Sequence, residues 1–146
     1  MSENAASVVP TEGASLIPIC GIGASAGGVT ALRKFFSRVR TDLNLAYVVV
    51  VHLSPDHPSA LSEILGACTR MPVNQVEDSP EVKANCVYVI PPDRELVIDG
   101  NSIAARPFTQ PRGQRAPIDM LFRSIAASRG DGCGIVLSGY TCRRVC

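Results

Sequence analysis

The chain has 146 residues, of which 46% are hydrophobic and 18% charged, a size and balance typical of one globular domain. Its net charge is +1 and it contains no Trp, which argues against a general attraction to nucleic acid or an anionic membrane surface. No apolar run approaches the roughly 20 residues of a membrane span, and residues 1–15 lack the Lys or Arg of a secretory signal. We therefore expect a cytoplasmic protein that binds no nucleic acid and does not insert into a membrane.

Six cysteines and two histidines are the obvious candidates for metal ligands. The cysteines form no C-x-x-C pair, and His52 and His57 lack the spacing of a zinc finger relative to them. We expect no structural metal site and no cofactor. We interpret the cysteines as small buried hydrophobes or, near the end of the chain, as accidental thiols.

The first part of the chain predicts a leader, a strand and a helix. Residues 1–15 are small and polar, and we expect them to be a flexible leader. The apolar run at residues 16–20 predicts a strand that ends in a glycine-rich turn at residues 21–28. Apolar side chains at helical spacing predict that a helix follows: Val29, Leu32, Phe35, Phe36 and Val39.

A second strand and a second helix come next. Residues 45–51 are continuously apolar and rich in valine, which is typical of a central parallel strand buried on both faces. The strand ends in His52, and a loop at residues 54–58 leads to a helix. The side chains expected on its inward face are Leu61, Ile64, Leu65 and Cys68.

The remaining pattern completes an alternation of strands and helices. Four short apolar runs predict two strands and then a hairpin: residues 73–76, residues 86–90, and residues 96–98 with 102–105. A helix is predicted over residues 117–128, with Pro117 in its first turn. Its expected inward side chains are Ile118, Leu121, Phe122, Ile125 and Ala126. With a last strand at residues 134–137, the alternation predicts an α/β fold: a doubly wound, mostly parallel sheet with helices on both faces.

The sequence after this last strand is unusual for such a fold. A turn and a covering helix should follow, but residues 138–146 contain two cysteines and an arginine pair. We therefore expect an exposed sheet edge and a fold that is incomplete at its C-terminus. The predicted organisation is a domain at residues 16–139 and an aberrant tail at residues 140–146.

The glycine-rich turn allows a dinucleotide-binding interpretation. Residues 21–26 satisfy the G-x-G-x-x-G/A pattern between a strand and a helix. The full fingerprint also needs a carboxylate at the end of the second strand, and that strand ends in His52 instead. Asp42 precedes the strand and belongs to the other end of the sheet. Dinucleotide binding is therefore kept as the less favoured alternative.

A nucleophilic serine is the second interpretation of the same turn. Ser25 lies at a strand-to-helix turn, and His52 ends the neighbouring strand, so both belong to the carboxyl edge of a parallel sheet. His52 can act as the base that a serine nucleophile requires, and the backbone N–H of Ala26 can hold an oxyanion. The structural alternatives are that Ser25 is a helix N-cap and that His52 is an ordinary loop histidine. His57 is interpreted as a turn residue.

Five segments in order resemble the catalytic domain of the chemotaxis protein-glutamate methylesterases, the CheB type. They are residues 23–28, 48–53, 87–94, 117–124 and 134–139. Two further segments are most similar to the versions that open methylesterase–methyltransferase fusion proteins: residues 52–57 and 69–73.

The resemblance implies a serine hydrolase of bacterial signal transduction, with a Ser-His-Asp triad and no cofactor. It implies hydrolysis of glutamate γ-methyl esters on methyl-accepting chemoreceptors, with release of methanol, and possibly glutamine deamidation. It also implies a methyltransferase domain or protein as a partner. Ser25 matches the family nucleophile, His52 matches its base, and the backbone of Ala26 matches the oxyanion donor.

The sequence departs from the family at the triad aspartate. By count from Gly139, the position of that aspartate holds Arg143, and no carboxylate follows Asp131. Asp131 itself precedes the last strand and so belongs to the opposite edge. We interpret the tail as the product of a shifted reading frame or a truncation. A catalytically impaired interaction module of the same fold is the alternative function.

Overall fold

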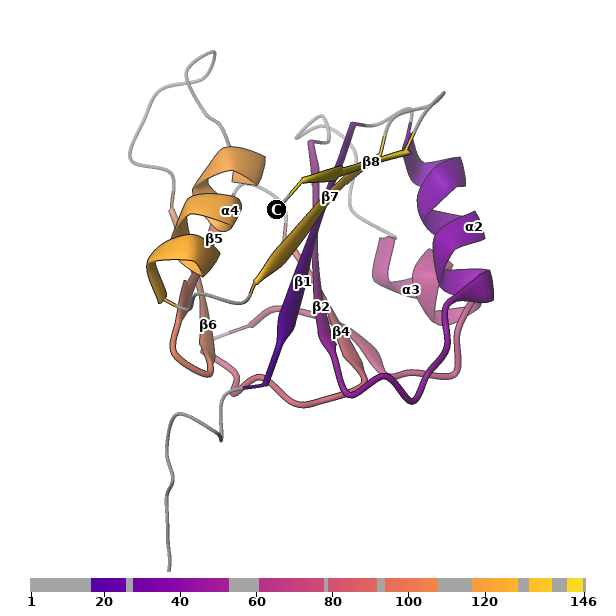
Figure 1. Ribbon diagram of the computed structural model, residues 1–146, viewed down its shortest axis with the longest axis horizontal. Coiled ribbons are helices and arrows are strands. Elements are labelled where there is room, and N and C mark those ends of the chain that lie inside the picture. The colour runs from indigo at the N-terminus through magenta and orange to yellow at the C-terminus, as the bar shows by residue number, and fades with distance from the viewer. Residues whose placement is uncertain are drawn as a thin grey trace, which may run out of the picture.

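The computed structural model of the chain shows a six-stranded sheet with helices on both faces (Figure 1). The residues it describes are 17–25, 28–52, 61–77, 79–91, 94–107, 117–128, 132–137 and 142–145. The predicted leader at residues 1–15 and the loop that contains His57 lie outside these ranges.

The strands of the large sheet run in the order β3-β4-β2-β1-β7-β8. Every neighbouring pair is parallel except β7 and β8, which are antiparallel. The predicted doubly wound, mostly parallel sheet is therefore confirmed. The strands are β1 (Ile19–Ser25), β2 (Ala46–His52), β3 (Val73–Gln75), β4 (Cys86–Val89), β7 (Cys133–Leu137) and β8 (Cys142–Val145).

Two layers cover the sheet. Helices α2 (Val29–Arg38) and α3 (Leu61–Gly66) pack on one face, and α4 (Pro117–Ser128) packs on the other. The predicted hairpin is confirmed as β5 (Arg94–Asp99) and β6 (Ser102–Pro107), and it lies on the α4 side (Figure 1). None of the described helices is long and apolar enough to cross a membrane.

Two predicted inward side chains are exposed. Helix α4 has the predicted bounds and buries Leu121 and Ile125, but Ala126 lies exposed because the face in contact with the sheet is narrower than the apolar stripe. Helix α3 has only six residues and buries Leu61 and Leu65, one turn apart. Ile64 is not on that row and is 37% exposed.

The expected exposed edge after the last parallel strand is not found. Residues 142–145 turn back and pair with β7, from Leu137 opposite Cys142 to Gly134 opposite Val145. The backbone groups on this edge of β7, for which we predicted no partner, are therefore hydrogen-bonded to β8. The prediction was wrong because the partner comes from the segment that we interpreted as an aberrant tail.

Two glycines of β1 allow α4 to pack directly on the sheet. A methyl group at Gly21 would lie 2.8 Å from Cδ1 of Ile125, and one at Gly23 would collide with the side chain of Ile118. Contacts below about 3 Å do not occur between real carbon atoms, so α4 occupies the space where side chains of β1 would stand. The glycines at these positions are a packing requirement of the fold.

The opposite face contains a buried tyrosine without a hydrogen bond. Tyr47 is 2% exposed and packs edge-on against Phe35 and Phe36, with ring centroids 6.2 and 5.6 Å away. Within the described part of the chain, its hydroxyl has no hydrogen-bond partner. Burial, and to a lesser extent the neighbouring Cys20 thiol, raises the pKa of Tyr47.

Replacing Gly23 by Ala should destabilise the protein. The added methyl must displace Ile118, and overpacking of this kind costs about 1–3 kcal/mol. The measurement is urea unfolding, with Gly66→Ala as control, because a methyl at Gly66 has only an ordinary contact at 4.0 Å with Val73. Equal stability of the two variants would contradict the packing account.

Replacing Tyr47 by Phe should stabilise the protein by about 1 kcal/mol, because an unpaired buried hydroxyl is removed. Tyr88→Phe should destabilise the protein, since the Tyr88 hydroxyl donates to the Glu81 carbonyl (3.2 Å) and accepts from the Lys83 N–H (2.8 Å).

The raised pKa of Tyr47 means that its hydroxyl proton is lost from the unfolded state at lower pH than from the folded state. The stability of the wild-type protein therefore falls as pH rises above about 10. The advantage of Tyr47→Phe in urea unfolding should therefore widen there.

Candidate active site

The structure brings the backbones of the predicted nucleophile and base together. Ser25 is the last residue of β1 and His52 the last residue of β2, and the two are direct register partners in a parallel pair. Neighbouring strands lie about 4.8 Å apart. Both residues end at the carboxyl edge of the sheet, where sites of α/β proteins form.

Strand alternation assigns both positions to the face that α4 covers. Gly21 and Gly23 contact α4, and Ser25 continues this series and is exposed. On β2, Ala46, Val48 and Val50 belong to the core cluster on the α4 side, so position 52 continues that series. The first turn of α4 lies over Gly23 through Ile118. The start of α4 is therefore close to this edge, and a helix start carries a partial positive charge.

Ser25 is not a helix cap, so that structural alternative is wrong. The N-cap of α2 is Gly28, with φ −90° and ψ 3°, and no side chain caps the helix. Ser25 lies three positions earlier in extended backbone and is exposed. Its hydroxyl is therefore not committed to starting α2.

Gly28, where the described chain resumes after Ser25, lies against the sheet. A methyl group there would lie 2.9 Å from the Leu137 carbonyl oxygen and 3.1 Å from the Ala24 Cβ. The start of α2 is therefore packed against the ends of β1 and β7. Ala26, the predicted oxyanion donor, and the side chain of His52 lie outside the described residues, so their predicted roles stay predictions.

The geometry opposes the dinucleotide interpretation. Space beside Gly21 and Gly23 is filled by α4, so these glycines do not open a cradle for a pyrophosphate. Asp42 precedes β2 at the amino edge, exposed and paired with Arg40 at 2.9 Å. The hydrogen bond and charge of Arg40 lower the pKa of Asp42. No group of three His, Cys, Asp or Glu side chains that could hold a metal ion occurs among the described residues.

Position 143, which corresponds by count to the family aspartate, does not reach the carboxyl edge beside β1. Strand β7 begins at Cys133 opposite Cys20, so the chain enters it from the amino edge, and Asp131 precedes that point, outside the described residues. Arg143 is the register partner of Val136 and is thus two strands from β1, level with Gly23. Its backbone is set back from the edge where Ser25 lies.

Sequence reasoning did not place the start of α4 beside this edge. The available signal was the spacing of Gly21 and Gly23, which leaves one face of β1 without side chains. A strand face of this kind indicates close approach of another element. The predicted helix at residues 117–128 had no predicted packing partner and was the candidate for that contact.

Comparison with known proteins gives a consistent result. Residues 20–142 match the family model described as CheB methylesterase. The chain is 31% identical over 128 residues to a Treponema denticola protein and 32% identical over 126 residues to one from Maricaulis maris. Both are named protein-glutamate methylesterase/protein-glutamine glutaminase. The alignments cover 84% and 83% of this chain but 34% and 31% of the relatives, so the chain spans about one third of their length.

A solved structure shares the fold. The crystal structure of the Thermotoga maritima CheB methylesterase catalytic domain superposes with a TM-score of 0.70 at 22% sequence identity. The match covers 82% of this chain and 66% of the solved one.

Replacing Ser25 by Ala should change the free energy of unfolding by less than about 0.5 kcal/mol, as is usual for an exposed side chain. Loss of a helix N-cap would cost about 1 kcal/mol. Ser124→Ala is the contrasting variant, because the Ser124 hydroxyl donates to the Leu121 carbonyl (2.8 Å) and accepts from the Ile98 N–H (3.0 Å). Urea unfolding that showed equal losses would assign Ser25 a structural role.

Proposed function

Because the chain belongs to the CheB methylesterase family, we propose that it hydrolyses glutamate γ-methyl esters on chemoreceptor proteins and deamidates glutamine side chains. The relatives that it matches carry both activities in their names. The observation that carries the proposal is the register pairing of Ser25 with His52 at the carboxyl edge. The proposed partners are a methylated chemoreceptor and a methyltransferase domain or protein, and the proposed location is the cytoplasm.

In the first step His52 accepts the Ser25 hydroxyl proton while Oγ attacks the γ-carbonyl carbon. The carbonyl electron pair moves onto oxygen, and the resulting oxyanion is held by the backbone N–H of Ala26. Loss of one such donor typically costs about 10²–10³ in turnover. The tetrahedral intermediate collapses, the bond to the methoxy oxygen breaks, and His52 returns the proton so that methanol leaves.

The second step regenerates the enzyme. Water attacks the carbonyl carbon of the acyl-Ser25 ester as His52 takes one of its protons. The intermediate collapses, the bond to Ser25 Oγ breaks, and His52 returns the proton to Oγ, which leaves free glutamate and the Ser25 hydroxyl. The same two steps on a glutamine side chain release ammonia in place of methanol. Apart from the substrate and water, protein side chains and backbone supply every group in this scheme.

Turnover by this chain is proposed to be slow, because position 143 holds Arg where the family has its triad aspartate. That aspartate orients the imidazole and stabilises the imidazolium. Its loss from a comparable triad lowers turnover by about 10⁴, or roughly 5.5 kcal/mol. The same substitution favours a second candidate function, an interaction module that binds the receptor without hydrolysing it.

The test measures methanol release from a methylated chemoreceptor. Slow release by the wild-type chain should fall to background in Ser25→Ala and in His52→Gln. Ser102→Ala is the matched serine control and should retain wild-type release, because Ser102 is exposed where the β5–β6 hairpin turns. Wild-type release equal to that of Ser25→Ala would exclude catalysis, and receptor binding by both proteins would then support the interaction module.

The register of β8 makes a further prediction about the missing carboxylate. Arg143→Asp should not restore turnover, because position 143 pairs with Val136 and lies two strands from Ser25. The imidazole belongs to β2, three strand spacings from β8, or about 14 Å, which is beyond hydrogen-bond reach. A gain of 100-fold or more in methanol release (about 2.7 kcal/mol) would contradict this placement.

A further inference from the structure

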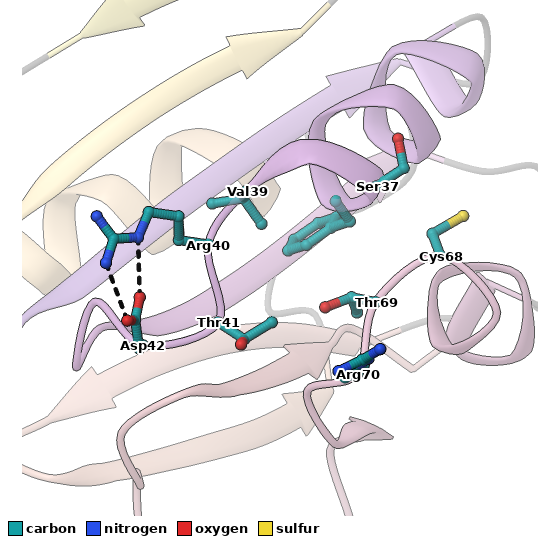
Figure 2. Close-up of a pocket in the computed structure, with 9 residues that line it drawn as sticks. Ser37, Val39, Arg40, Thr41, Asp42, Cys68, Thr69 and Arg70 are labelled. Carbon is teal, nitrogen blue, oxygen red and sulfur yellow. Dashed lines mark hydrogen bonds and ion pairs between the residues drawn. The ribbon is translucent and has the colours of Figure 1, made fainter.

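A cationic groove lies at the amino edge of the sheet, away from Ser25 and His52. Its walls are residues 36, 37 and 39–42, at and after the end of α2, and residues 68–70, after α3 (Figure 2). The cavity has a volume of about 500 Å³, within the range of small-ligand and peptide-binding clefts. We call it the basic groove.

The two guanidinium groups of the basic groove differ in what they already bind. Arg40 forms two bonds to Asp42, from Nε (3.0 Å) and Nη2 (2.9 Å), as Figure 2 shows. Arg70 stands exposed on the other wall, and among the described residues no carboxylate pairs with it. Of these two guanidinium groups, Arg70 is therefore the one with no carboxylate partner among the described residues, and it can bind an anionic group.

Hydroxyl groups add hydrogen-bond donors next to Arg70. The Thr69 hydroxyl oxygen accepts the Met71 N–H at 3.2 Å, which leaves its own proton available. Thr41 contributes a second hydroxyl from the facing wall (Figure 2). A guanidinium with nearby hydroxyl donors matches a carboxylate, which only accepts hydrogen bonds.

The positive surface continues along α2. Ser37 lines the basic groove, and Arg33 and Lys34 lie one turn earlier on the same stripe of the helix. These two side chains and Arg38 are exposed, and residues 29–41 contain no carboxylate. A chain with a net charge of only +1 thus has four cationic side chains within residues 33–40, and Asp42 is the carboxylate of the groove lining. A ligand with several carboxylates could place one on Arg70 in the groove and others beside the cationic side chains of α2.

We propose that the basic groove docks an acidic segment of a partner protein, with one carboxylate on Arg70. A nucleic acid fits less well, because Phe36 is the aromatic residue of the lining and is 1% exposed, so it offers no face for stacking a base. The docked segment would leave the carboxyl edge open. The inference goes beyond the proposed esterase function and does not depend on it.

The test uses a fluorescein-labelled hexaglutamate peptide and fluorescence anisotropy at low ionic strength, because screening weakens exposed charge pairs. The full chain should bind this peptide, and hexaglutamine should not bind. Arg70→Gln should raise the dissociation constant about fivefold or more. The matched control is Arg123→Gln, which removes the same charge from an exposed position on α4 and should leave binding unchanged.

A second measurement localises the peptide. Cys68 is part of the groove wall and is partly buried, as are Cys86 and Cys133 elsewhere. Bound hexaglutamate should slow alkylation of Cys68 by iodoacetamide without protecting the other two. Equal effects of Arg70→Gln and Arg123→Gln would overturn the proposal. Equally tight binding of hexathymidylate with the same dependence on Arg70 would also overturn it, in favour of a non-selective anion surface.

Discussion

The pairing of β1 with β2 is the constraint on which the site depends. Seven consecutive residues of each strand are in parallel register, and the ladder ends with Ser25 opposite His52. A slip of one residue would shift one end by about 3.3 Å and move its side chains to the other face. The register is held by burial, since Val48, Val49 and Val50 of β2 are all fully buried between the two helical layers. The backbones of Ser25 and His52 at the sheet edge are thus positioned by buried apolar residues farther down the two strands.

Close packing of α4 on β1 is the second constraint on the site. It shows that the glycine pattern serves helix packing and does not form a dinucleotide site. Gly21 and Gly23 have no side chains, so one face of β1 is bare at these two positions. Ile125 and Ile118 of α4 occupy the space that side chains would otherwise fill. The same spacing satisfies a dinucleotide fingerprint when it is read along the sequence alone. The distinction lies in what fills the space above the glycines, which is a property of tertiary packing. Here a helix fills it, and that helix begins close to Ser25.

The sequence predicted the alternation of strands and helices, the bounds of α4 and the shared edge of Ser25 and His52, because each follows from local periodicity or from parallel topology. It did not predict which apolar side chains a helix leaves exposed, such as Ile64 and Ala126, because that depends on how the helix sits on the sheet. Strand β8 was also missed. Its residues form a strand by pairing with the edge of β7. Pairing of this kind depends on the tertiary structure and produces no hydrophobic periodicity in the sequence.

Helix direction accounts for the different groups that we propose to bind negative charge at the two edges of the sheet. Helix α2 follows β1, and α4 passes from Ile118 over Gly23 to Ile125 over Gly21, so both begin at the carboxyl edge and end at the amino edge. Helix starts present backbone N–H groups and partial positive charge, whereas helix ends present carbonyl groups and partial negative charge. The proposed oxyanion beside Ser25 therefore lies at an edge where helix starts favour negative charge. At the amino edge the backbone opposes an anion, and side chains must supply the positive charge, which is where Arg38 and Arg70 lie.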